Sequence, residues 1–354
     1  MAKIDIISGF LGAGKTTLIR KLLMDALKGQ KVVLIENEFG EIGIDGGFLK
    51  DAGIEIKEMN SGCICCSLVG DFGTALKEVA ETYHPDRIII EPSGVGKLSD
   101  VIHAVERVKE DSDLTLNCAV TVVDVTKCKM YLKNFGEFFK NQVEAAGTII
   151  LSRTDLPKAT EEKVEEALKL IRQLNPDATV ITTPVEILGG EKVLDTMEGV
   201  KVDLSHVEEE HDHHEDCGCG HGHDHGHGGH EEHEHHHHGY AHGDGEECGH
   251  DHGHEHHHHH HHADEVFQSW GRETIRRFRR EELEEILRKL SEGDTFGTVL
   301  RAKGMVEGTD GRWIYFDMVP EEADIRDGAP EYTGRICVIG AGLQEDRLAE
   351  LFGV

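Results

Sequence analysis

Residues 9–17 read GFLGAGKTT, and this stretch decides the fold of the N-terminal half. It follows KIDIIS (residues 3–8), which has the pattern of a short buried strand, and it opens a segment with the Leu and Ile spacing of a helix. The pattern G-x-x-x-x-G-K-[ST] between a strand and a helix is that of a phosphate-binding P-loop. Its backbone N–H groups surround phosphate oxygens, and the helix N-terminus adds a positive dipole end. We therefore expect a nucleoside triphosphate site here.

Each residue type in this loop has an expected task. Gly9, Gly12, Ala13 and Gly14 form the loop that approaches the phosphates. We expect Lys15 to reach the β- and γ-phosphates and Thr16 to ligate Mg²⁺. The alternative, a glycine-rich turn without a ligand, does not explain the complete pattern in this context.

A second nucleotide motif follows in RIIIEPSG (residues 87–94). Glu91 ends a buried strand, where an acid can hold Mg²⁺ through water, and Gly94 can offer its N–H to a γ-phosphate. Asp124, which ends AVTVVD, competes with Glu91 for this role, and either acid is alternatively a solvated strand end. We prefer Glu91 because its spacing to Gly94 supplies both partners, so the expected catalytic residues are Lys15, Glu91 and Gly94.

The motif expected to recognise the nucleotide base is IILSRTDL (residues 149–156). Asp155 is placed to accept from both N–H donors on the edge of guanine, donors that adenine does not present together. Arg153 can lay its stem along the purine. The usual motif is Asn-Lys-x-Asp, so Ser152 and Arg153 depart from it, and an ordinary polar strand end is the alternative. The pattern favours GTP.

Three cysteines crowd together in NSGCICC (residues 60–66). Cys63, Cys65 and Cys66 follow a predicted strand, so we expect them at the same sheet edge as the P-loop. Thiolates are zinc ligands, and a carboxylate can complete the site. Glu36, Glu38 and Glu41 in ENEFGEIG are candidates for this ligand. Buried unreactive cysteines and redox chemistry are the alternatives.

Strand patterns recur through the first half and alternate with helical segments. Apolar, β-branched strands arranged in this way predict an α/β domain with a mainly parallel sheet and helices on both faces. We assign residues 1–205 to this P-loop NTPase domain. Its other predicted strands are residues 31–36, 53–59, 87–91, 119–125, 148–152 and 178–183.

Strand and helix patterns occur again in residues 263–354. We predict that these residues form a small α+β domain with a ferredoxin-like layer of helices on an antiparallel sheet. Its predicted elements are strands at 265–274, 297–307, 312–319 and 334–340 and helices at 279–290 and 345–352.

Residues 206–262 separate the two domains and differ in composition from both. They carry 25 of the 27 histidines and 15 Asp or Glu, without any Lys or Arg. Such a segment has little to bury, so we expect a disordered linker that binds several ions of Zn²⁺, Ni²⁺, Co²⁺ or Cu²⁺. Cys217, Cys219 and Cys248 add softer ligands. A purification tag or a solubilising acidic stretch are the alternatives.

The charge, the hydrophobic pattern and the cysteines argue against a nucleic-acid-binding, a membrane-spanning or a secreted protein. A formal net charge of −31 argues against nucleic acid as a partner. No apolar run approaches the ~18 residues that a membrane span needs. The N-terminus lacks a separate apolar signal core. Nine cysteines without a regular framework fit reduced thiols, so we expect a cytoplasmic protein.

These motifs together resemble the CobW-type metal-trafficking P-loop GTPases. The resemblance rests on GFLGAGKTT, ENEFGEIGID, NSGCICC, EPSG and SRTD, and the segment GTVLRAKG…GRWIYFDMV is similar to the second domain of that family. It covers most of the chain outside the histidine-rich insertion. The resemblance implies that phosphate and Mg²⁺ are contacted by Gly12, Gly14, Lys15, Thr16 and Thr17. It also implies that Glu91 is the acid of the second nucleotide motif and that Asp155 recognises the base.

The function that the resemblance implies is a GTP-dependent metallochaperone. Such a protein hydrolyses GTP and couples it to the transfer of a transition metal, zinc or sometimes cobalt, to an apo-metalloprotein client. A nickel- or cobalt-insertion GTPase and a passive metal store stay open as alternatives. The sequence is compatible with a homodimer but does not encode one.

Overall fold

The computed structural model describes residues 1–37, 55–59, 69–109, 113–198, 200, 204 and 266–354. The described residues before and after the gap at 205–265 belong to one compact unit. Cys63, Cys65 and Cys66, Glu38 and Glu41, and the histidine-rich tract at 206–262 lie outside the described residues.

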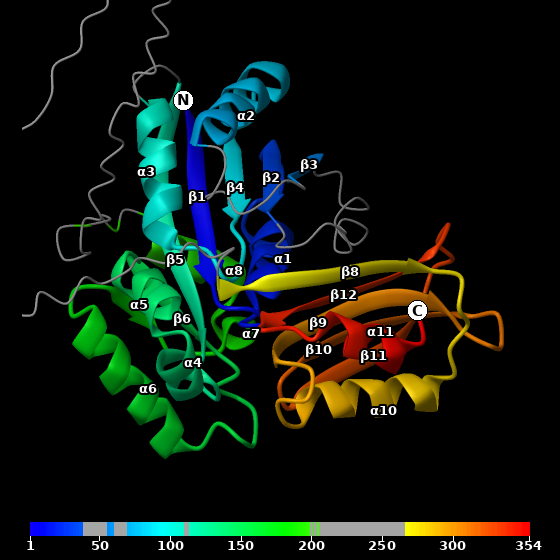
Figure 1. Cartoon of the computed structure of the whole chain (residues 1–354). Helices are drawn as coiled ribbons and strands as arrows, with labels where there is room; N and C mark the ends of the chain where they lie inside the picture. Colours follow the sequence, from blue (N-terminus) through cyan, green and yellow to red (C-terminus); the bar gives the residue numbers. More distant parts are fainter. Residues whose placement is uncertain (38–54, 60–68, 110–112, 199, 201–203, 205–265) are drawn as a thin grey trace, which may run out of the picture. The chain divides into compact units, whose positions relative to one another are not determined.

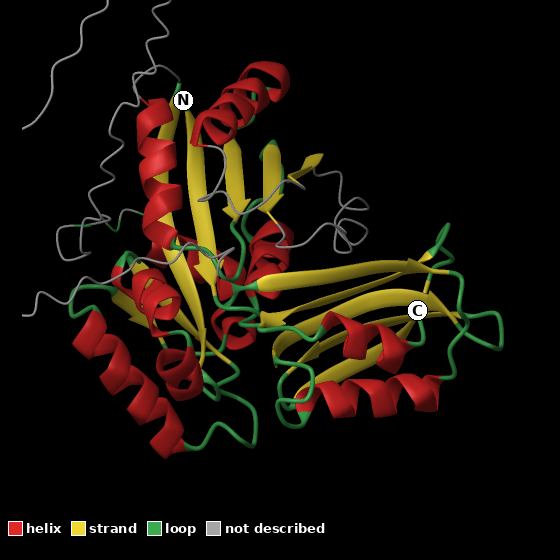
Figure 2. Cartoon of the chain, in the orientation of Figure 1, coloured by secondary structure: helices red, strands yellow, loops and turns green. Residues whose placement is uncertain are grey.

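The N-terminal domain has a seven-stranded sheet, in the described residues, with the order β3-β2-β4-β1-β5-β6-β7 (Figure 2). Every pairing in it is parallel, as the sequence predicts. Ile88, Ile89 and Ile90 of β4 are fully buried, because helices cover both faces of the strand. The strands are β1 (Ala2–Gly9), β2 (Val32–Asn37), β3 (Glu55–Met59), β4 (Arg87–Glu91), β5 (Leu114–Asp124), β6 (Thr148–Ser152) and β7 (Thr179–Ile181).

Two apolar layers hold this sheet between helices. On β1, Ile4 and Ile6 belong to one core and Ile7 to the other, as alternation along a strand requires. Helices α2, α3, α5 and α6 pack in the first core, and α1 and α8 in the second; Figure 1 shows α3 in front of the sheet and α1 behind it. The helices are α1 (Lys15–Asp25), α2 (Val69–Tyr83), α3 (Leu98–Lys109), α4 (Cys128–Asn134), α5 (Gly136–Glu144), α6 (Glu161–Leu174), α7 (Val185–Leu188) and α8 (Gly190–Met197).

The C-terminal domain is an α+β unit with an antiparallel sheet, which confirms the predicted class. The sheet has the order β11-β10-β9-β12-β8, and α10 and α11 pack on one face of it. Its elements are β8 (Gln268–Thr274), α10 (Arg280–Ser291), β9 (Thr298–Glu307), β10 (Trp313–Val319), β11 (Glu322–Gly328), β12 (Gly334–Ala341) and α11 (Glu345–Phe352).

Strand β11 is absent from the sequence prediction. Its sequence EADIRDG contains one large apolar residue, Ile325, between charges, so it carries too weak an alternation for a strand assignment. The strand forms because β10 supplies a complete antiparallel partner, with Ile325 opposite Phe316. Charged side chains on such an edge strand also discourage pairing with another chain.

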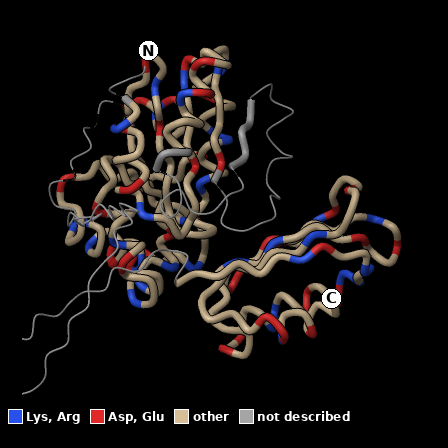
Figure 3. The backbone as a smooth tube through the Cα atoms, turned by 45° about the horizontal axis from the view of Figure 1, so that its top comes forward, with Lys and Arg blue, Asp and Glu red and all other residues tan. Residues whose placement is uncertain are grey.

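Two further features of the described residues are the length of the helices and the distribution of charge. No described helix is both long and apolar enough to cross a bilayer. Lys and Arg are interspersed with Asp and Glu along the described chain (Figure 3).

Candidate functional site

The P-loop lies between the end of β1 and the start of α1. Gly14 has a φ of 103° and is the residue directly before the helix, a conformation that favours glycine. Gly9 has a φ of 141°, and a Cβ there would lie 2.4 Å from the carbonyl oxygen of Val122 on β5. The neighbouring strand therefore approaches too closely for any side chain, so two glycines of the motif are dictated by the backbone path.

Lys15 is buried and its ammonium donates to the carbonyl oxygen of Gly9 at 3.0 Å. It also lies 3.9 Å from a carboxylate oxygen of Glu91. The hydroxyl of Thr16 lies 3.3 Å from each carboxylate oxygen of Glu91. The three residues expected to handle phosphate and Mg²⁺ are thus neighbours, although β4 and the P-loop are distant in sequence.

Gly94 lies directly against the P-loop. A Cβ at this position would come within 2.9 Å of the backbone nitrogen of Leu11, so only glycine fits without displacing the loop. The buried Gln142 of α5 donates from one amide nitrogen to the carbonyl oxygens of Gly94 and Gly96, at 3.1 and 2.8 Å. Gln142 was not predicted from the sequence, because a lone glutamine in a helix carries no signal of a distant backbone partner.

Asp124, the rival acid, is occupied by other groups. One of its oxygens accepts from the backbone N–H and the hydroxyl of Thr126, at 2.8 and 2.6 Å. The other lies 3.2 Å from the Arg153 guanidinium. Asp124 therefore orients the loop after β6 (the base loop, residues 152–156), while Glu91 stands beside Thr16. This geometry favours Glu91 over Asp124 as the carboxylate that holds Mg²⁺.

The base loop after β6 contacts the P-loop through Arg153. This residue has a left-handed φ of 60°, and its guanidinium donates to the carbonyl oxygen of Gly12 at 3.1 Å. The side chain of Ser152 lies close to Gly14. Asp155 is exposed in the turn that follows, where a purine edge can reach it. The unusual Ser-Arg pair thus still connects the base loop to the phosphate loop.

Among the candidate ligands for a transition metal, only Glu36 is described. It is buried at the carboxyl end of β2, in register with Glu91 on β4. Within the described residues no group of three or more His, Cys, Asp or Glu is arranged to hold a metal ion. A metal site that uses the cysteine loop stays a prediction, with Glu36 as its described residue.

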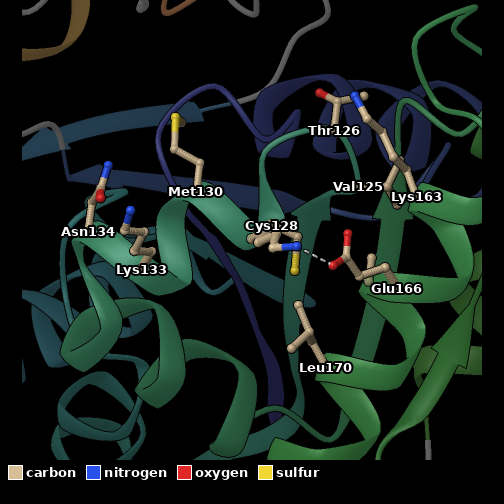
Figure 4. Close-up of a pocket in the computed structure, with 11 residues that line it drawn as sticks. Val125, Thr126, Cys128, Met130, Lys133, Asn134, Lys163, Glu166 and Leu170 are labelled. Carbon is tan, nitrogen blue, oxygen red and sulfur yellow. Dashed lines mark hydrogen bonds and ion pairs between the residues drawn. The ribbon is translucent and has the colours of Figure 1, made fainter.

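A separate cavity of about 420 Å³ lies between α4 and α6 (Figure 4). Cys128 faces it together with Leu170, and Lys129 pairs with Glu166 at 2.6 Å across its rim. Burial raises the pKa of the Cys128 thiol to about 12. The thiol therefore stays protonated near neutral pH, which disfavours metal binding at this cavity.

A P-loop at the end of the first strand of a parallel sheet, with an acid beside the P-loop threonine, defines a nucleotide-binding protein. Residues 3–182 match the CobW/HypB/UreG nucleotide-binding domain, and residues 267–353 match the cobalamin synthesis protein CobW C-terminal domain. The chain belongs to the CobW/HypB/UreG family.

The chain is similar to several known proteins. The zinc chaperone CobW of Sinorhizobium is 34% identical over 243 residues, which cover 58% of this chain and 67% of that protein. The zinc-regulated GTPase metalloprotein activator 1 of Dictyostelium discoideum is 27% identical, over 54% of this chain and 48% of that protein. The chain therefore spans about half to two thirds of the length of these relatives. The crystal structure of the Zn(II)-bound YjiA GTPase from Escherichia coli has a TM-score of 0.40 and 20% identity, and covers 99% of this chain and 98% of that one.

Proposed function

We propose that this protein is a GTP-dependent metallochaperone that couples GTP hydrolysis to the binding and transfer of zinc to a client protein. Family membership and the names of the relatives support this function. The observation that carries it is the register pairing of Glu36, a candidate metal ligand, with Glu91, the candidate acid of the nucleotide site. Paired residues of neighbouring strands lie on the same face of the sheet.

The residues around Thr16 fit a magnesium ion. The hydroxyl of Thr16 and the carboxylate of Glu91 are hard oxygen donors, which Mg²⁺ prefers, and they lie 3.3 Å apart. When bound, Mg²⁺ would neutralise charge on the β- and γ-phosphates. Lys15 would bind the same phosphates, and the N–H of Gly94 would donate to a γ-phosphate oxygen.

The second metal in the proposal is zinc, the cargo that the protein transfers. Cys63, Cys65 and Cys66 would supply thiolates, with Glu36 or Glu41 as an oxygen ligand. Because Glu36 and Glu91 are neighbours, movement of the backbone at either site would displace the other. Arg153 and Asp155 would hold the guanine base. The reduced cysteines that such a site needs fit a cytoplasmic protein.

The proposal requires that metal and nucleotide affect each other's affinity by the same factor. The test is a zinc titration of the full chain with a competing chelator, with and without a non-hydrolysable GTP analogue. We expect a difference of at least about fivefold in zinc affinity, the lower end of typical coupling. Equal affinities would exclude the coupled mechanism.

A passive metal store is the second candidate, and the histidine-rich tract favours it. With 25 histidines, residues 206–262 offer far more ligands than one transfer site needs. A nickel- or cobalt-insertion GTPase would use the same tract, because imidazole also binds those ions. Comparing zinc, nickel and cobalt in the titration above identifies the metal that is coupled to GTP.

A further inference from the structure

The C-terminal domain contacts the P-loop through the end of β10. Val319, the last residue of β10, is buried, and a Cβ placed on Gly12 would lie 2.6 Å from one of its methyl carbons. The P-loop backbone at Gly12 is therefore covered directly by a side chain of the second domain. A rearrangement of either partner would be transmitted to the other.

Arg153 makes a second, polar connection at the same place. Its guanidinium donates to the Gly12 carbonyl oxygen at 3.1 Å and to the carboxylate of Glu322, the first residue of β11. Its remaining nitrogen lies 3.2 Å from Asp124. The side chain expected to lie along the purine is thus fixed by three acceptors, and one of them belongs to the second domain.

A buried lysine adds to this cluster. Lys127 is 4% exposed, and its ammonium has no hydrogen-bond partner within the described residues. Burial lowers its pKa, Asp124 and Glu322 raise it, and Arg153 and Lys158 lower it further, so these charges lie within range of one another. Three cations therefore share two carboxylates. Without the charge of Glu322, the cations would face Asp124 alone, and like-charge repulsion would displace Arg153.

From these contacts we infer that Glu322 is a positioning residue for nucleotide binding, which holds the Arg153 guanidinium against the P-loop from the second domain. The inference rests on the proposed function, since a nucleotide must bind for its affinity to change. Glu322 itself need not touch the nucleotide. By linkage, a bound nucleotide would in turn stabilise the contact between β11 and the base loop.

The test compares the affinity of the full chain for a fluorescent GDP analogue in four forms. We expect Glu322→Gln to weaken binding by about tenfold, because a displaced contact residue costs up to about 10²-fold. Glu322→Asp keeps the charge, so we expect it to lose at most about threefold. The control is Asp324→Asn on the same strand, whose exposed carboxylate pairs with Arg326, and we expect wild-type affinity for it.

Steady-state kinetics separate positioning from catalysis. Since the described contact of Glu322 is with Arg153 rather than with Lys15 or Glu91, we expect Glu322→Gln to raise KM for GTP and to leave kcat within about twofold. A loss of kcat with unchanged KM, or an unchanged affinity of Glu322→Gln beside a wild type that binds, would overturn the inference and leave the proposed function standing. A wild type that binds no GDP analogue would instead overturn the proposed function.

Hydrogen exchange of the wild-type chain tests the reverse direction without any variant. We expect amides of β10 and β11 (residues 313–328) to exchange more slowly when GDP is bound, while those of α10 stay unchanged. Equal exchange of residues 313–328 in both states would contradict the inference, even if Glu322→Gln fails to fold.

Discussion

Glu36 and Glu91 occupy paired positions on the neighbouring parallel strands β2 and β4. Both strands end here, at the edge of the sheet where the P-loop begins after β1. Glu36 is a candidate ligand for a transition metal, and Glu91 lies within 3.3 Å of the P-loop residue Thr16. One strand pair thus reaches from the predicted metal site to the predicted nucleotide site.

The carboxylate of Glu91 is expected to act in hydrolysis rather than in binding of the base. We expect Glu91→Gln to lower kcat for GTP by about 10²-fold, the effect of removing one charge-stabilising group. GDP affinity would change far less. The measurement is phosphate release over a range of Mg²⁺ concentrations. Asp195→Asn, on the exposed side of α8, is the control, and an equal loss in both variants would argue against a specific role of Glu91.

The cysteine loop is expected to supply the tight zinc site. We expect Cys63→Ser combined with Cys66→Ser to weaken the tightest zinc site at least tenfold, which corresponds to about 1.4 kcal/mol. Serine lacks the thiolate that zinc prefers. Competition with a chromophoric chelator measures the affinity. Unchanged affinity in this variant would move the tight site elsewhere, for example into residues 206–262.

Removing the histidine-rich tract distinguishes a metallochaperone from a passive metal store. For a chain in which a short flexible linker replaces residues 206–262, we expect most of the bound zinc to be lost. One tight zinc ion and the GTPase rate would remain. Metal analysis after dialysis counts the ions, and phosphate release gives the rate. Loss of all tight zinc would favour storage by the tract.

The buried cysteines are expected to be unreactive. Burial raises the pKa of the Cys128 thiol to about 12 and raises that of Cys118 well above its ordinary value. Only the thiolate reacts, so both stay inert from pH 7 to 9. We expect iodoacetamide, followed by peptide mass spectrometry, to leave Cys118 and Cys128 unmodified in the folded chain. Rapid labelling of either would show that its surroundings open.

A buried ion-pair cluster at the amino ends of the strands is expected to matter for stability. Arg87 pairs with Asp5 and Glu198, and both Arg87 and Asp5 are buried. Replacing Arg87 with Met would leave the charge of Asp5 uncompensated and cost about 3–5 kcal/mol. Urea denaturation measures this loss. Lys129→Ala, which breaks an exposed pair with Glu166, is the control and is expected to cost less than about 1 kcal/mol.

The same cluster predicts a dependence on pH. Burial alone would raise the pKa of Glu198, but its hydrogen bonds from Arg87 and Lys3 lower it below the ordinary 4.5. Its stabilisation is therefore complete above pH 4.5 and is lost as the pH falls through the lower pKa of the folded state. We expect the wild type to lose stability below about pH 4 more steeply than Glu198→Gln. Parallel curves would contradict this assignment.

Much of the fold follows from local pattern. The strands at 87–91 and 148–152 have the bounds that the sequence predicts, because each has consecutive apolar residues at its centre, such as the three isoleucines of RIIIE. Strand β11 was missed because its stability comes from pairing with β10 rather than from its own residues. Gln142 and Lys127 were missed for a similar reason. Their roles depend on which backbone or charge the fold brings beside them.

The sequence by itself determined most of the strands and helices along the chain, the P-loop and the family to which the chain belongs. Short contiguous segments encode these features, because the spacing of their residues reflects local backbone geometry. Only the tertiary structure decided that Glu91 rather than Asp124 stands beside Thr16, that Glu36 is level with Glu91, and that Glu322 reaches Arg153. Such pairings join residues that are distant along the chain, and their proximity arises from strand order and domain packing, which no local spacing encodes.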